Sequence, residues 1–169
     1  MIKIDIKRTV VSLIDTFVNA GKVSLEIRKK GLIKKIKADG TPVTNGDIEI
    51  NDIILRRIKE LTPNIPIVSE ETSENKSRED LKNFWLIDPI DGTYDYINNL
   101  EEFTINAGLI INNEPAAGLI SAPAKNRMFY SYGKGSAFEL LKGEAVKLDI
   151  FKNFNKNEIT FLSYSKKIK

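Results

Sequence analysis

The sequence predicts an α+β fold in which two N-terminal helices pack on an antiparallel sheet. Up to residue 61 the apolar residues recur at helical spacing, and from residue 65 onward they form short runs separated by turn residues. The helical segments precede the strands instead of alternating with them, which is typical of α+β domains. The hydrophobic fraction of 41% is large enough to build a buried core.

The first helix is predicted from near Asp5 to near Arg28, and Gly31 ends it. Its apolar positions lie on one helical stripe: Ile6, Val10, Leu13, Ile14, Phe17 and Val18. Residues 37–42 are polar and include glycine and proline, so we expect a loop there.

The second helix is predicted from Thr44 to about Leu61, before the helix-breaking run Thr62-Pro63-Asn64. Its core-facing positions are Ile50, Ile53, Ile54, Leu55 and Ile58. At its start, Thr44 and Asp47 match a capping box. Capping alone would explain Asp47, but this carboxylate could also face a metal site, and the spacing leaves both interpretations open.

Two short apolar strands, residues 65–68 and 84–87, each run directly into carboxylates. The segment between them, residues 72–80, is polar and charged, as expected of a surface loop. A short helix is predicted from Thr93 to about Asn99. Further strands are predicted at residues 103–111, 116–123, 128–132, 137–141, 145–150 and 159–164, the last belonging to a further structural unit.

The chain contains no histidine and no cysteine. These absences exclude Ser-His-Asp and Cys-His nucleophilic catalysis and argue against zinc. A metal site would consist of oxygen ligands, which suit Mg²⁺, Mn²⁺ or Ca²⁺.

Net charge is +3, with 26 basic and 23 acidic residues interspersed, so no nucleic-acid polymer is expected as a partner. No apolar run reaches the length of a transmembrane segment, and the N-terminus lacks the pattern of a signal peptide. We therefore expect a cytoplasmic protein, with peripheral membrane association as an alternative left open.

Glu70, Asp88 and Asp91 follow the two strands that end in carboxylates. Neighbouring strands deliver such side chains to one edge of a sheet, where three carboxylates repel one another unless positive charge lies between them. The sequence therefore predicts one or two divalent cations here, with the Ile90 carbonyl as a neutral ligand. Glu71 is expected to be an ordinary surface carboxylate. The alternative for the whole set is that these residues serve only as turn, cap and surface residues.

Gly92 and Thr93 begin the short predicted helix, whose first N–H groups favour a phosphate. Gly92 permits close backbone approach, and the Thr93 hydroxyl can orient a water molecule. Beside a divalent cation, these features predict metal-assisted hydrolysis of a phosphate ester.

With these residues in place, the chain resembles the inositol monophosphatase superfamily of Mg²⁺-dependent, lithium-sensitive phosphatases. Residues 37–44 resemble its N-terminal loop. Residues 67–71, Ile-Val-Ser-Glu-Glu, and 85–93, Trp-Leu-Ile-Asp-Pro-Ile-Asp-Gly-Thr, resemble its two metal motifs. Residues 102–106, Ser69, and the runs 121–123 and 128–130 are most similar to the CysQ-like branch, the 3′(2′),5′-bisphosphate nucleotidases.

The resemblance implies that Glu70, Asp88, Asp91 and the Ile90 carbonyl bind two or three Mg²⁺ ions, with Mn²⁺ as an alternative. It implies that Glu70 and Thr93 handle the attacking water and that Asp47 assists at a third ion. The substrate would contact the same edge, at the residues Glu70, Ile90, Asp91, Gly92 and Thr93.

The implied activity is hydrolysis of 3′-phosphoadenosine 5′-phosphate, a small phosphomonoester, to AMP and phosphate. An inositol monophosphatase is the enzymatic alternative, and a catalytically dead remnant that only binds divalent ions is the non-enzymatic one.

Two departures from the family pattern qualify that implication. Tyr94 stands where CysQ-like chains commonly have lysine. No Trp-Asp-x-Ala motif is present, since the single tryptophan is Trp85. We therefore expect residues 1–154 to form a metal-binding N-terminal domain and residues 155–169 to begin a second α/β domain that is mostly lacking. The expected partner is then a complementing C-terminal chain or a second copy, and phosphatase activity of this chain alone should be very weak.

Overall fold

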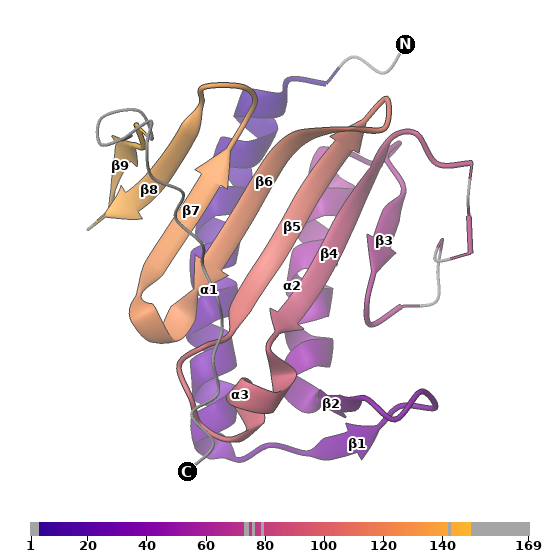
Figure 1. Ribbon diagram of the computed structural model, residues 1–169, viewed down its shortest axis with the longest axis vertical. Helices are drawn as coiled ribbons and strands as arrows, with labels where there is room; N and C mark the ends of the chain where they lie inside the picture. Colours follow the sequence, from indigo (N-terminus) through magenta and orange to yellow (C-terminus); the bar gives the residue numbers. More distant parts are fainter. Residues whose placement is uncertain (1–3, 73–74, 76, 79, 142, 150–169) are drawn as a thin grey trace, which may run out of the picture.

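The computed structural model describes residues 4–72, 75, 77–78, 80–141 and 143–149. Helices α1 (Ile6–Lys30) and α2 (Asn45–Leu61) lie side by side across one face of a twisted sheet (Figure 1). The Asp5 carboxylate caps α1 by accepting from the Arg8 backbone N–H at 2.9 Å. The last helical residue is Lys30, two residues beyond the predicted end, and Gly31, with φ of 106°, follows it. Both predicted helices are confirmed.

The sheet has seven strands in the order β3-β4-β5-β6-β7-β8-β9. After the edge strand β3 (Ile67–Ser69), the bounds are β4 (Phe84–Asp91), β5 (Thr104–Ile111), β6 (Glu114–Ala122), β7 (Arg127–Ser131), β8 (Ala137–Leu141) and β9 (Glu144–Lys147). Two short helices connect strands: α3 (Thr93–Ile97) between β4 and β5, and the 3₁₀ helix η1 (Pro123–Lys125) between β6 and β7. The α+β fold class is thus confirmed, while the predicted strand at residues 159–164 and the unit at 155–169 lie outside the described residues.

One strand pair differs from the predicted antiparallel arrangement. β3 pairs in parallel with β4, and each of the other neighbouring pairs in this sheet is antiparallel. Parallel neighbours need a long crossover instead of a tight hairpin. Residues 70–83 connect these two strands. The sheet is mixed because it combines this parallel pair with antiparallel ones.

A separate two-stranded sheet, β1 (Lys34–Ile36) and β2 (Pro42–Thr44), was not predicted. It encloses the predicted polar loop, which turns through hydrogen bonds from Lys37 N to Thr41 O (2.8 Å) and from Gly40 N to Lys37 O (3.0 Å). Each strand has only three residues and β1 is exposed throughout, so no apolar period marks them. The hairpin lies beside α3, at the end of the sheet where β4 terminates (Figure 1).

The core lies between the two long helices and the facing side of the sheet. Its largest side chains are Trp85, Tyr96, Phe17, Phe103, Leu13, Ile50, Ile54, Ile58, Ile87, Ile90, Ile105 and Leu109. The indole Nε1 of Trp85 donates to Thr62 Oγ1 at 3.0 Å, so its polar atom is satisfied inside the core. Within the described part of the chain, no helix is long and apolar enough to cross a membrane.

Candidate metal and phosphate site

A β-bulge places Asp88 and Asp91 on the same face of the sheet. Residues three apart in a regular strand point to opposite faces. In β4, however, Asp88 pairs with Asn106 and Asp91 pairs with Thr104, and the register shifts between the two pairs. Because Asn106 and Thr104 are two residues apart on β5, their partners face one side. Ile87 and Ile90, each 1% exposed, fill the core on the other side.

The parallel pairing of β3 brings Glu70 next to Asp88. Ser69 pairs with Ile87, and the Glu70 backbone N–H donates to Ile87 O at 3.1 Å. Ser69 is fully buried and donates to Asn51 Oδ1 of α2 at 2.6 Å, so it points toward the helices. The following side chain, Glu70, therefore turns to the side that carries Asp88. The three predicted carboxylates thus share one end and one face of the sheet.

Lys37, in the loop between β1 and β2, forms an ion pair with each member of the glutamate pair. Its Nζ lies 3.0 Å from Glu70 Oε1 and 2.7 Å from Glu71 Oε1. Burial alone would lower the pKa of Lys37, but the hydrogen bonds and charges of the two glutamates outweigh it and raise this pKa. Nothing in the sequence indicated these contacts, which join segments more than thirty residues apart.

The prediction that Glu71 is an ordinary surface carboxylate is wrong. Its side chain is only 4% exposed, compared with 44% for Glu70. Burial raises the pKa of Glu71, while the hydrogen bond and charge of Lys37 oppose that rise. Glu71 therefore anchors the β1–β2 hairpin to the end of β3.

The carboxylates share an edge without forming a ready-made coordination shell. In the described part of the chain, no three Asp or Glu side chains lie close enough together to hold a metal ion. Lys37 draws Glu70 toward the hairpin, and Asn106 Nδ2 donates to Asp91 Oδ2 at 3.2 Å on the other side. Lys37 thus holds Glu70, whereas Asn106 contacts just one of the two oxygens of Asp91, Oδ2.

Asp88 lies between them and is the least favourably placed carboxylate of the site. Burial, followed by the negative charges of Glu70 and Asp91, raises the pKa of Asp88 to about 7. Its Oδ1 is buried and has no hydrogen-bond partner among the residues that the structure describes. A half-buried carboxylate with an unsatisfied acceptor, flanked by two exposed carboxylates, fits a hard divalent cation.

Asp47 performs the capping function and also faces the site. Its Oδ2 accepts from the Thr44 backbone N–H at 2.7 Å and from Thr44 Oγ1 at 2.6 Å, completing the capping box of α2. Its Oδ1 lies 3.5 Å from Thr93 Oγ1. Asp47 is 1% exposed, and burial raises its pKa. The two interpretations of Asp47 are therefore compatible, because each uses a different oxygen.

The Thr93 hydroxyl points back into the turn that carries the carboxylates. It donates to the Ile90 carbonyl at 3.0 Å, the same oxygen that was predicted to bind a cation. Thr93 is the first residue of α3, so its N–H has no intrahelical partner. Gly92 before it has φ of 89°, and a Cβ built there would lie 2.7 Å from Glu102 O. Only glycine fits this turn without displacing backbone.

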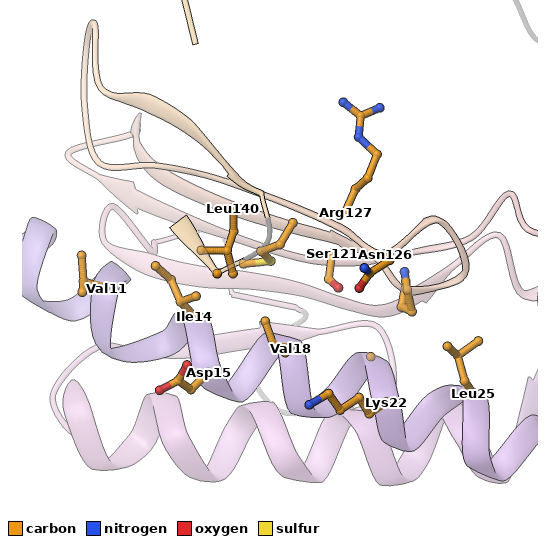
Figure 2. Close-up of a pocket in the computed structure, with 14 residues that line it drawn as sticks. Val11, Ile14, Asp15, Val18, Lys22, Leu25, Ser121, Asn126, Arg127 and Leu140 are labelled. Atoms are coloured by element: carbon orange, nitrogen blue, oxygen red, sulfur yellow. The ribbon is translucent and has the colours of Figure 1, made fainter. Parts of the chain in front are cut away.

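A separate cavity of about 630 Å³ lies between α1 and the β6–η1–β7 region (Figure 2). Val11, Ile14, Val18 and Leu140 point into it from α1 and β8, while Arg127 extends away from it. None of the predicted site residues lines this cavity. The carboxylate site is therefore distinct from it.

Comparison with known proteins assigns this architecture to a family. The model of the inositol monophosphatase family matches residues 5–165, and the chain belongs to that family.

More particularly, the chain is similar to the 3′(2′),5′-bisphosphate nucleotidase CysQ of Haemophilus influenzae. The two are 31% identical over 144 residues, covering 84% of this chain and 51% of the relative. Among solved structures it resembles CysQ from Bacteroides thetaiotaomicron, with a TM-score of 0.65, 28% identity, and 83% of this chain and 53% of that one covered. A second structure, an IMPase/NADP phosphatase complexed with Mg²⁺ and phosphate, shares the fold, with a TM-score of 0.67, 19% identity, and 78% and 51% covered. The chain spans about half the length of the curated relatives it matches.

Proposed function

We propose that this chain carries the metal-binding half of a phosphomonoesterase. The observation that supports this most directly is the position of Asp88, half-buried between Glu70 and Asp91, with an unpartnered oxygen in the described structure. Such an arrangement is unfavourable for folding alone and becomes favourable when a divalent cation offsets the negative charge.

The residues that would hold the cation are Glu70, Asp88, Asp91 and the Ile90 carbonyl. They offer carboxylate and carbonyl oxygens, the ligand types that Mg²⁺ and Mn²⁺ prefer. We propose two or three Mg²⁺ ions, with Mn²⁺ able to replace them. When bound, the metal would polarise the phosphate oxygens and lower the pKa of the attacking water.

The protein groups beside these ligands orient and deprotonate that water. Thr93 Oγ1 donates a hydrogen bond to the Ile90 carbonyl at 3.0 Å, which leaves its lone pairs able to accept a hydrogen bond from water. Asp47 Oδ1, 3.5 Å from this hydroxyl, and Glu70 are the carboxylates positioned to accept the proton of the water. We expect the backbone N–H groups at Gly92 and Thr93 to bind the phosphate, and the lack of a side-chain cap at the start of α3 in the described structure supports this.

The proposed substrate is 3′-phosphoadenosine 5′-phosphate, hydrolysed to AMP and phosphate. This choice follows the CysQ relatives, which are 3′(2′),5′-bisphosphate nucleotidases by name. The chain spans about half the length of the curated relatives it matches, so we propose that a full active site also needs residues outside this segment, supplied by the same protein, by a complementing C-terminal chain or by a second copy. For the same reason we expect residues 1–169 alone to release phosphate very slowly, since transition-state stabilisation depends on a preorganised site that excludes water.

The test is a chimera in which this chain replaces the matching half of H. influenzae CysQ. With Mg²⁺ and 3′-phosphoadenosine 5′-phosphate, the chimera should release phosphate, and the Asp88→Asn chimera should lose at least about 10²-fold in rate. Asp52→Asn, which changes an exposed carboxylate on α2, is the matched control and should leave the rate unchanged. A folded chimera that hydrolyses inositol monophosphate in preference to the nucleotide would overturn the substrate assignment. Equal rates for Asp88→Asn and the parent would overturn the metal site.

A further inference from the structure

Asn106 occupies the centre of the carboxylate face without having an assigned role. It lies on β5, directly opposite Asp88 of β4 on one side and Ile120 of β6 on the other. Its neighbours on this face are the carboxylates Asp88 and Asp91 on one side and the exposed apolar side chain of Ile120 on the other. The amide therefore lies at the boundary between the carboxylates and an apolar part of the sheet.

Among the described residues, one hydrogen bond orients the amide group, and its acceptor is Asp91. Its Nδ2 donates to Asp91 Oδ2 at 3.2 Å, a diagonal cross-strand contact across the β-bulge. A flipped amide would place its carbonyl against the carboxylate and repel it, so the orientation is determined by chemistry. One oxygen of Asp91 is thereby fixed toward β5.

The other amide atom contributes nothing to the stability of the fold. Asn106 Oδ1 is buried and, among the described residues, has no hydrogen-bond partner. A buried acceptor without a donor is unfavourable, because it has lost its hydrogen bonds to water. A β-branched apolar side chain would pack at this strand position without that penalty. Asn106 is therefore poorly suited to a purely structural role.

We propose that Asn106 is a positioning residue for the metal edge: its Nδ2 holds one oxygen of Asp91, so that this carboxylate keeps the orientation in which it binds a divalent cation. The inference deepens the proposed function and rests on it. Asn106 acts through Asp91 and touches neither substrate nor reacting atoms. Hydrogen bonds of this kind to a metal ligand change metal affinity by about 10–100-fold.

The experiment compares Asn106→Val with the parent chain in two measurements without substrate. Thermal unfolding in EDTA reports the stability of the metal-free fold, and calorimetric titration with Mg²⁺ reports affinity. The variant should be as stable as the parent or more stable, yet bind Mg²⁺ about 10–100-fold more weakly. A structural role predicts the reverse, with lost stability and unchanged affinity.

Asn83→Ala is the matched control. Asn83 Oδ1 accepts from the Asn112 backbone N–H at 2.8 Å at the opposite end of the same strand pair. This variant should lose stability and keep Mg²⁺ affinity. In an Asp91→Asn background, Asn106→Val should have no further effect on Mg²⁺ affinity, because the group it positions is gone.

The outcomes separate the two hypotheses. A parent chain that shows no Mg²⁺ binding would refute the metal site and, with it, this inference. A parent that binds Mg²⁺ while Asn106→Val binds it equally well would refute only the inference. If Asn106→Val weakens Mg²⁺ binding further in the Asp91→Asn background, Asn106 does not act through Asp91. That result would also refute the inference.

Discussion

Replacing Asp88 by asparagine should stabilise the metal-free protein at alkaline pH. A pKa raised from 3.8 to about 7 corresponds to about 4 kcal/mol of unfavourable free energy for the ionised form. Asp88 is half-buried, so solvent screening leaves about 2 kcal/mol. The amide introduced by Asp88→Asn carries no charge and avoids this unfavourable free energy. At pH 8 in EDTA the variant should therefore melt about 4–8 °C above the parent.

The pH dependence has a definite sign. Below pH 3.8 the carboxyl is mostly protonated in both the folded and the unfolded state, and the destabilisation vanishes. Between 3.8 and about 7 the unfolded chain ionises first, so the parent loses stability as pH rises. Burial also raises the pKa of Glu71, but Asp88 is not among the groups that shift it, so Glu71 contributes equally to parent and variant. The charge of Asp47 contributes to the raised pKa of Asp88, and the variant relieves that repulsion too.

The assay is urea unfolding at pH 5, 6.5 and 8, with Asp52→Asn as the control for loss of an exposed carboxylate. The advantage of Asp88→Asn should grow across this series in EDTA. Added Mg²⁺ should stabilise the parent and not the variant. A variant that is no more stable than the parent at pH 8, or one that gains as much from Mg²⁺, would refute the electrostatic reasoning.

Three further substitutions probe the elements that build the site. Gly92→Ala should destabilise the fold by about 2 kcal/mol or more in urea unfolding, because φ is 89° and the new Cβ would lie 2.7 Å from Glu102 O; a neutral effect would mean that the turn adapts. Lys37→Met should lower the free energy of unfolding by about 3 kcal/mol at pH 8 and by less at pH 5, since it leaves the buried Glu71 carboxylate unpaired. The double variant Lys37→Met with Glu71→Gln should recover most of this loss. Tyr96→Phe should cost about 1–2 kcal/mol in thermal unfolding, because its hydroxyl donates to Ser24 O at 2.7 Å inside the core; an unchanged melting temperature would contradict this.

The elements that the sequence predicted best are those with a buried, periodic face. The stripes of α1 and α2 repeat over several turns, and the runs of β4 to β7 alternate between core and surface. The β1–β2 hairpin has no such face and was missed. The direction of β3 was also missed, because three residues carry a burial pattern but no information about the neighbouring strand.

The candidate site was predictable where its carboxylates directly follow the ends of apolar strands. Glu70, Asp88 and Asp91 became candidates because carboxylates directly after apolar runs have few structural explanations, and Thr93 because its hydroxyl begins the short helix that follows them. Lys37 was not, since its partners lie across the hairpin. Asn106 belonged to a run similar to the CysQ-like branch, but its contact with Asp91 arises from the β-bulge, which no local pattern indicated.

The site is built from backbone features that bring carboxylates together, and their mutual repulsion reduces the stability of the metal-free fold. The bulge brings Asp91 to the face of Asp88, and the parallel pairing of β3 adds Glu70 to the same face. Lys37 neutralises charge only on the side of the two glutamates, so the repulsion between Asp88 and Asp91 is left without a cationic partner in the described structure. A sequence selected for folding alone would replace these groups with neutral or apolar ones. That opposition between stability and cation binding is why the same substitutions should strengthen the metal-free fold and weaken its response to Mg²⁺.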